Sequence, residues 1–360
     1  MMEPAVVITA FSELGLFLRQ FGTKGSVNTS FKGLNDEFYD RFQDLVKIQC
    51  QYNGWFTEDN VRHAIASISV SLTREKLEKW LLKYESEIKK NKTCRKIGVI
   101  MAGNIPLVGF HDFLCVLTSG NIFIGKTSSN DKFLLPFVAE ILISIEPAFK
   151  DLIFFTDNQV KNADAIIATG SNNSSRYFDY YFGKYPHVIR KSRNSVAVLN
   201  GTETARDLKN LGKDIFQYFG LGCRNVSKLF VPEGYDFDPF FKAIYEYKNV
   251  INNNKYGNNY DYNKVVYLMN KIKLIENGFL VLKEDTGLAS PVAVLYYEYY
   301  PDKKTVSERL KANDHNIQCI VSGNKEIEGV IGFGKTQYPG LWDYADGVDT
   351  MRFLFAKKSA

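Results

Sequence analysis

The chain has 360 residues, of which 45% are hydrophobic and 24% are charged. This balance excludes a disordered or fibrous protein, and the length predicts two globular domains of ordinary size. The net charge is only +5 and the basic residues are scattered, so the composition argues against a nucleic-acid-binding protein.

The five cysteines include no CxxC pair, which is unlike a disulfide framework or a zinc site. We therefore expect a cytoplasmic protein that binds no metal. The apolar run at residues 5–18 is interrupted by Ser12 and Glu13, unlike a signal peptide. Because no uncharged stretch approaches the ~18–20 residues that cross a bilayer, we also expect no membrane span.

Residues 1–95 predict a helical segment. Apolar residues recur with helical spacing over 35–53 and 74–88, and Ser71 or Thr73 is suited to cap the second of these helices.

Residues 96–194 predict an alternation of strands and helices. Short apolar runs bounded by Gly, Asn or Asp predict strands at 97–101, 122–125, 152–156 and 165–168, with helices at 107–117, 133–143, 159–163 and 174–182. Such an alternation is typical of a doubly wound parallel sheet.

A second α/β series occupies residues 195–335. Strands are predicted at 195–199, 227–232, 278–283 and 292–297, and helices at 205–219 and 239–246. The stretch 251–263 is rich in Asn, Tyr and Gly without periodicity, so we expect an exposed loop. Residues 336–360 form a tail that packs back on the fold. The predicted fold class is α/β, with two doubly wound domains after the helical segment.

The end of the first predicted strand carries a candidate ligand site. Gly103, Asn104 and Pro106 stand between this strand and a helix, and α/β proteins bind ligands at the carboxyl ends of strands. Glycine allows close approach of the backbone, Asn104 offers an amide donor, and Pro106 suits the first turn of a helix. The same residues fit an ordinary tight turn equally well.

Two further strand ends carry residues suited to a nucleotide. Lys126 follows the second strand together with hydroxyl residues that include Ser128, and Gly170 and Ser171 follow the fourth strand. Three such ends in one sheet favour a ligand that carries phosphate groups.

Cys223 has the surroundings of a nucleophile. Gly220 and Gly222 remove bulk around it, and Arg224 could lower the pKa of its thiol, which in activated sites falls to roughly 3.5–7.5. A thiolate at this position could attack a thioester carbonyl. We expect the other four cysteines to be unreactive and to act only as small hydrophobic residues.

These motifs, in this order, resemble the acyl-CoA reductase (LuxC-type) branch of the aldehyde dehydrogenase superfamily. The matching phrases lie at residues 103–107, Lys126, 169–171 and 222–223, and the tail 343–351 is similar as well. The resemblance covers the chain from about residue 96 onward.

The resemblance implies that residues 96–194 bind a nicotinamide cofactor and that residues 195–335 form a catalytic cysteine domain. It makes Cys223 the nucleophile, and it makes Asn104 an oxyanion donor together with the Cys223 backbone N–H. It further implies that Lys126 binds the adenosine ribose.

The remaining cofactor contacts also follow from the resemblance. Gly170 and Ser171 would lie near the pyrophosphate or nicotinamide, and either Glu284 or Asp285 would bind a ribose. Ser128 and its polar neighbours would accept a 2′-phosphate, so we expect NADPH, with NADH as the alternative. The same hydroxyls also suit the start of a helix.

One departure from the aldehyde-oxidising relatives bears on the reaction. Those enzymes carry a glutamate in a Glu-Leu-Gly-Gly-Lys phrase that activates water, whereas residues 187–193 here contain no acid. Without that base an acyl-cysteine would survive until hydride reduces it. We therefore expect NADPH-dependent reduction of a long-chain acyl-CoA or acyl-carrier thioester to the aldehyde.

Two alternatives stay open at this point: NAD(P)-dependent aldehyde oxidation, and a non-reducing subunit that only carries or transfers the acyl group. We also expect a homo-oligomer. Family members often pair with acyltransferases, and the residues leave open whether this chain does.

Overall fold

The structure, a computed structural model, describes residues 2–23, 25–91, 93–170, 177–178, 180–324 and 326–356. The chain divides into two compact units. Unit 1 comprises residues 1–191 and 339–360, and unit 2 comprises residues 192–338, so unit 2 is inserted into the sequence of unit 1. Among the described residues, none of the helices combines the length and the apolar character needed to span a membrane.

Helices fill the chain before the first strand of unit 1, as the spacing predicted. They are α1 (Pro4–Leu18), α2 (Lys32–Leu34), α3 (Asp40–Tyr52), α4 (Glu58–Ser71), α5 (Arg74–Leu81) and α6 (Glu85–Lys90), with a π-helical turn at Asn35–Tyr39 and 3-10 turns at Arg19–Phe21, Thr29–Phe31 and Leu82–Tyr84. Of the two predicted caps, Thr73 is the one that caps α5, because its hydroxyl accepts a hydrogen bond from the Lys76 N–H.

The strands of unit 1 form a parallel sheet in the order β3-β2-β1-β4-β5. They are β1 (Lys96–Ile100), β2 (Ile122–Lys126), β3 (Ile153–Phe155), β4 (Ala165–Thr169) and β5 (His187–Arg190). The helices α7 (Phe110–Thr118) and α8 (Leu134–Ile145), with a 3-10 turn at Pro147–Asp151, pack with α1 against one face in a large apolar core. Ile100 of β1 pairs with Lys126 and with Ala168, so the carboxyl ends of β1, β2 and β4 lie at one edge.

Two helices predicted in unit 1 differ from the structure or lie partly outside its described residues. The helix predicted at 159–163 is wrong, because this segment is irregular and its Val160 and Ala163 side chains pack against the sheet. A Cβ on Gly98 would come within 2.7 Å of the Val160 side chain, and Asn162 has a φ of 57°. The helix predicted at 174–182 falls partly outside the described residues.

The strands of unit 2 form a second sheet in the order β12-β11-β6-β7-β10-β9-β8, in which β8 alone pairs antiparallel among the described strands. They are β6 (Asn194–Val198), β7 (Val226–Pro232), β8 (Leu274–Glu276), β9 (Val281–Glu284), β10 (Val294–Tyr300), β11 (Ile317–Val321) and β12 (Val330–Ile331). The α/β class with parallel sheets behind helical residues is therefore confirmed.

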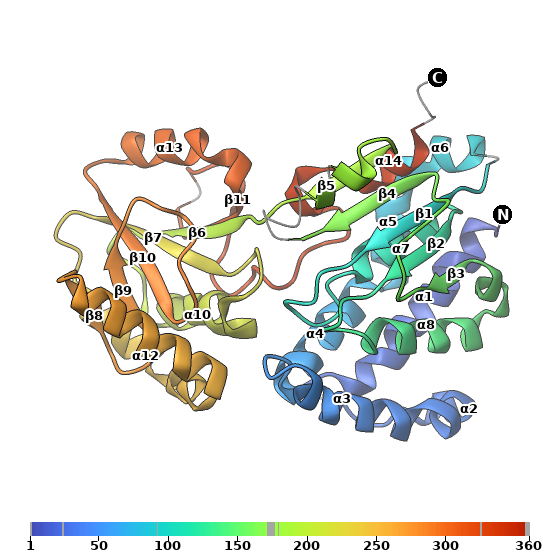
Figure 1. The fold of residues 1–360 in the computed structure, drawn as a ribbon, viewed down its shortest axis with the longest axis horizontal. Coiled ribbons are helices and arrows are strands. Elements are labelled where there is room, and N and C mark those ends of the chain that lie inside the picture. The colour runs from blue at the N-terminus through green and yellow to red at the C-terminus, as the bar shows by residue number, and fades with distance from the viewer. Residues whose placement is uncertain are drawn as a thin grey trace. The chain divides into compact units, whose positions relative to one another are not determined.

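Helices cover both faces of this second sheet (Figure 1). One face carries α13 (Lys303–Ala312), and the other carries α10 (Ala205–Phe216), α11 (Asp238–Ile244) and α12 (Asn254–Met269). Short 3-10 turns lie at Gln217–Gly220, Tyr245–Asn252 and Asp314–Asn316.

The exposed loop predicted at 251–263 is wrong, because most of this stretch belongs to α12. The Asn253 side chain caps the helix by accepting from the Lys255 and Tyr256 N–H groups. Tyr256, Tyr260 and Asn263 form its buried face, and the Tyr256 hydroxyl donates to the Phe279 carbonyl at 2.9 Å. The helix escapes an apolar-periodicity search because its buried face is aromatic and polar.

The C-terminal segment completes the core of unit 1. It contains a 3-10 turn at Ala345–Gly347 and α14 (Thr350–Phe355), whose Met351 and Leu354 are buried. The Trp80 indole N–H donates to the Tyr344 hydroxyl at 2.7 Å, and the Tyr84 hydroxyl donates to Asp349 at 2.9 Å. The tail therefore packs back on unit 1.

Two side chains near the tail have structural partners. The His111 Nε2 lies 2.9 Å from the Leu341 carbonyl oxygen. Arg190 donates to the Asp112 carboxylate at 2.7 Å and to the Thr350 hydroxyl at 2.9 Å.

Candidate active site

The cysteine loop, residues 221–225, joins a distorted helix end to β7. The helix predicted at 205–219 is too long, because α10 ends at Phe216. Tyr218, Phe219 and Gly220 then have φ angles of 53°, 57° and 78°. Left-handed backbone costs a non-glycine residue roughly 1–2 kcal/mol, so other interactions must hold this turn in place.

Asn225 supplies those interactions through one buried amide. Its Nδ2 donates to the carbonyls of Asp214 at 3.0 Å and Gln217 at 2.8 Å, and its Oδ1 accepts from the Gly222 N–H at 2.9 Å. The amide thus satisfies carbonyls at the end of α10 and fixes the residue before Cys223. Asn225 was not predicted as a functional residue, and the sequence signals it only by its position between a glycine-rich turn and a strand.

Arg224 and Asp214 connect the same loop to the segment 334–336. The Arg224 Nε donates to the Thr336 carbonyl at 2.6 Å, while Asp214 accepts from the Gly334 N–H at 2.6 Å and from the Thr336 hydroxyl at 2.8 Å. Burial raises the pKa of Asp214 above its ordinary value. Cys223 itself is half-buried, and the effect of Arg224 on its thiol stays a prediction.

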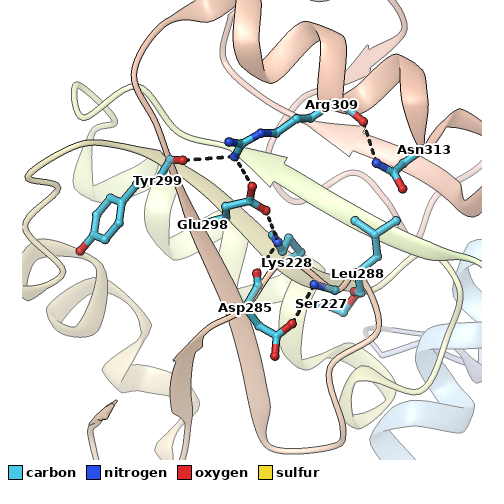
Figure 2. Close-up of polar contacts among 9 residues, drawn as sticks. Ser227, Lys228, Asp285, Leu288, Glu298, Tyr299, Arg309 and Asn313 are labelled. Carbon is cyan, nitrogen blue, oxygen red and sulfur yellow. Dashed lines mark hydrogen bonds and ion pairs between the residues drawn. The ribbon is translucent and has the colours of Figure 1, made fainter. Parts of the chain in front are cut away.

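Two serines hold the backbone on either side of β7's start: one bonds the cysteine loop, and the other bonds the segment that follows β9. The Ser195 hydroxyl donates to the Cys223 carbonyl at 2.9 Å, and the Ser227 hydroxyl donates to the Leu288 carbonyl at 2.7 Å (Figure 2). Within unit 2, the segment after Glu284 is therefore bonded to β7 at a residue that lies four positions after the predicted nucleophile.

The structure also distinguishes the two acids at the end of β9. Asp285 is engaged, because its carboxylate binds Lys283 and accepts from the Gly287 N–H at 2.8 Å. The Lys283 ammonium holds the pKa of Asp285 below its ordinary value. Glu284 is exposed, so it is the acid better placed to meet a ligand.

In unit 1 the predicted residues gather at the carboxyl edge of the sheet. Asn104 follows β1 and is exposed, Lys126 is the last residue of β2, and Gly170 follows β4. Their strands are adjacent in the order β2-β1-β4, so one ligand can reach all three. Ser171 lies outside the described residues.

A buried carboxylate stabilises the turn that carries Asn104, residues 103–107. The Asp131 carboxylate accepts from the Leu107 N–H at 2.8 Å, and Leu107 has a φ of 58°. Burial raises the pKa of Asp131 to about 6. Pro106 lies in this turn and not, as expected, in the first turn of a helix, since α7 begins at Phe110.

Ser128 packs against the same turn. A Cβ on Gly103 would come within 2.6 Å of the Ser128 Oγ, which also accepts from the Asn130 N–H at 3.2 Å. Lys132, the nearby cation, pairs with Asp157 at 3.1 Å. Ser128 therefore supports the backbone of the turn, whatever it contributes to a ligand.

The described ranges contain no cluster of three or more His, Cys, Asp or Glu side chains that could hold a metal ion.

Comparisons with known proteins agree with this architecture. The family model of the acyl-CoA reductase (LuxC) matches residues 43–246, more than half of the chain. No curated protein matches the sequence significantly.

Among solved structures, an indole-3-acetaldehyde dehydrogenase from P. syringae in complex with NAD+ is similar at a TM-score of 0.63 and 11% identity, over 90% of this chain and 73% of that one. The NAD+ complex of an aldehyde dehydrogenase from Bacillus cereus gives a TM-score of 0.56 and 11% identity, over 88% and 72%. An NADP-dependent enzyme from E. coli gives 0.55 and 10%, over 89% and 77%.

These structural similarities show that the chain has the aldehyde dehydrogenase fold. The family match confirms the resemblance carried by the motifs around Asn104 and Cys223. The chain therefore belongs to the LuxC acyl-CoA reductase family and is an oxidoreductase that acts on acyl and aldehyde groups.

Proposed function

We propose that this enzyme reduces a long-chain acyl thioester to the aldehyde, with NADPH as reductant and with Cys223 as the covalent carrier of the acyl group. The observation that supports this most directly is that side-chain hydrogen bonds fix the backbone of the cysteine loop. Asn225 holds Gly222 in place, Ser195 donates to the Cys223 carbonyl, and Ser227, four residues after Cys223, donates to Leu288 in the segment after Glu284. A fixed backbone can present a thiol and its own N–H in one orientation.

In the first step the Cys223 thiolate attacks the thioester carbonyl. The bond to the leaving thiol breaks, and that thiol departs with a proton while the acyl group stays on Cys223. The Asn104 amide and the Cys223 backbone N–H stabilise the oxyanion of the tetrahedral intermediate. Losing one such donor typically costs roughly 2.7–4 kcal/mol of barrier.

The carboxyl edge of the unit 1 sheet suits a nicotinamide dinucleotide, because Lys126 ends β2 and Gly170 follows β4, the two strands that flank β1. In unit 2, Glu284 is exposed at the end of β9, and the family resemblance makes it a candidate ribose-binding acid. When bound, the cofactor supplies the hydride that reduces the acyl group. The thiohemiacetal on Cys223 then collapses, which breaks the C–S bond and releases the aldehyde and the thiol.

We prefer NADPH because Lys126 ends β2 and the hydroxyls of residues 127–129 follow it directly. The ion pair between Lys132 and Asp157 reduces the positive charge there, so NADH is the alternative to compare. Solved relatives include both NAD+ complexes and an NADP-dependent enzyme.

The test is single-turnover oxidation of NADPH or NADH with acyl-CoA substrates of several chain lengths, followed by absorbance. We expect aldehyde from the wild type and none from Cys223→Ala. Asn104→Ala should still acylate Cys223 but at least a hundredfold more slowly. Cys50→Ala, which alters an exposed cysteine in unit 1, serves as the control and should behave as wild type.

Two outcomes would refute the proposal. If Cys223 becomes acylated but neither cofactor is consumed, the chain is an acyl carrier. If the enzyme oxidises aldehydes with NAD(P)+ and releases free acids faster than it reduces thioesters, it is a dehydrogenase.

A further inference from the structure

A fully buried lysine lies inside the sheet of unit 2. Lys228, on β7, has no solvent exposure, and it lies on the face that α13 covers. Burial lowers its pKa below the ordinary value. Lysine is rarely fully buried unless it is paired, so its partners should explain why it is there.

The charge of Lys228 is balanced within a network. Its Nζ donates to the Glu298 carboxylate at 2.5 Å, and Arg309 of α13 binds the other oxygen of the same carboxylate. Replacing a buried ion pair by apolar residues of similar volume often leaves stability unchanged or increases it. The pair alone is therefore a weak reason for a lysine at this position.

The second bond of Lys228 points to a different role. Its Nζ also donates to the Asp285 carbonyl at 2.5 Å, directly after Glu284, and the neighbouring Ser227 donates to the Leu288 carbonyl (Figure 2). Two consecutive residues of β7 thus hold the segment 285–288. Since β10 separates β7 from β9 in the sheet, this segment crosses β10 to reach them.

The position of β7 gives these bonds their importance. The strand begins three residues after Cys223, and Ser227 and Lys228 are its second and third residues. The same short stretch therefore carries the predicted nucleophile at one end and holds the segment after Glu284 at the other.

We propose that Lys228 is a positioning residue that fixes the segment 284–288 relative to Cys223 and so sets where the nicotinamide end of the cofactor binds. This inference rests on the function proposed above. It assigns Lys228 no contact with the reacting atoms.

The test separates cofactor binding from acylation. Lys228→Met removes the bond to Asp285 but also leaves Glu298 without one partner. The double variant Lys228→Met/Glu298→Gln removes that unpaired charge and keeps an acceptor for Arg309, so it should fold. Lys264→Met is the matched control, because it breaks another Lys–Glu pair of unit 2, with Glu276.

For each variant, cofactor affinity is measured by NADPH fluorescence, and acylation of Cys223 is measured by mass spectrometry without cofactor. We expect the double variant to bind NADPH at least tenfold more weakly while its acylation rate stays within about threefold of wild type. Lys228→Arg, which restores a donor, should recover part of the affinity. Lys264→Met should match wild type in both measurements.

The inference fails if the double variant binds NADPH as wild type does, or if affinity and acylation fall by the same factor, as a general loss of structure would cause. Failure of the underlying function looks different. In that case the wild type itself binds no nicotinamide cofactor, and the role of Lys228 is refuted with it.

Discussion

Two loops carry the predicted catalytic groups, and they are held in different ways. The turn 103–107 in unit 1 bears Asn104, and the loop 221–225 in unit 2 bears Cys223. Left-handed non-glycine residues occur in the first and directly before the second. One buried polar side chain stabilises each: Asp131 in unit 1 and Asn225 in unit 2.

The difference lies in the chemistry of the two side chains. The Asn225 amide is neutral, and both its oxygen and its nitrogen have hydrogen-bond partners. Among the described residues, the Asp131 Oδ1 has no hydrogen-bond partner, and burial raises the pKa of the carboxyl to about 6. The support of the cysteine loop should therefore be independent of pH near neutrality, whereas the support of the asparagine turn should titrate.

Removing the amide should have the largest effect. Asn225→Ala leaves the carbonyls of Asp214 and Gln217 without this donor and frees the Gly222 N–H. We expect the free energy of unfolding to fall by about 2–4 kcal/mol. The acylation rate of Cys223 should fall at least tenfold, as mass spectrometry of the acyl-enzyme would show.

Asn313→Ala is the matched control for Asn225. Its amide also donates to a carbonyl near a helix end, that of Arg309 at 2.9 Å, but away from the cysteine loop. This variant should lose about 1 kcal/mol of stability and keep the wild-type acylation rate. Equal losses of acylation in both variants would contradict a specific role for Asn225.

Neutralising the carboxyl should have an intermediate effect that depends on pH. The folded pKa of Asp131, about 6, exceeds its value in the unfolded chain, so its contribution to stability is fully present below the unfolded pKa and is lost as pH rises through 6. Relative to Asp131→Asn, the wild type should therefore lose about 1–2 kcal/mol between pH 5 and pH 8. Urea unfolding across this range measures it.

Asp164→Asn provides the comparison. Asp164 also accepts from a backbone N–H, that of Lys96 at 3.0 Å, but it is only half-buried. This variant keeps Asp131, so it should show the same loss of stability between pH 5 and pH 8 that Asp131 gives the wild type. If the free energy of unfolding of Asp131→Asn changes with pH in the same way as that of Asp164→Asn, the carboxyl of Asp131 is not the source of the pH dependence.

The smallest expected effect concerns the segment 334–336, which is bonded to Asp214 and Arg224. Thr336→Val removes the hydroxyl that donates to Asp214 but leaves the backbone N–H groups of Gly334 and Thr336 in place. We expect a loss of about 1 kcal/mol in urea unfolding. Thr305→Val, which removes an exposed bond to Asp302, should lose less, and a larger loss there would reverse the order.

Much of the fold could be predicted from apolar patterning. The strands that became β1, β2, β4, β6 and β7 are short apolar runs, and their parallel order places Lys126 and Gly170 at one edge. The C-terminal limit of α10 could not be predicted, because Asn225 sets it from nine residues beyond the last helical residue.

Other features were hidden because they depend on tertiary contacts. The buried face of α12 is built from tyrosines and an asparagine, which a search for apolar residues does not detect. Lys228 was overlooked for a related reason, since a lone lysine in a strand usually points to solvent. Its two partners lie far along the chain: the Asp285 carbonyl directly after β9, and Glu298 of β10, which also binds Arg309 of α13.

The insertion of unit 2 into unit 1 has a consequence for protein synthesis. Unit 2 is one continuous stretch, whereas unit 1 is completed only by residues made after unit 2, such as Tyr344 and Met351. On the ribosome, unit 2 can therefore fold before the tail residues that bond Trp80 and Tyr84 have been synthesised. Until α14 has been synthesised, the apolar surface that it later covers stays open to chaperones.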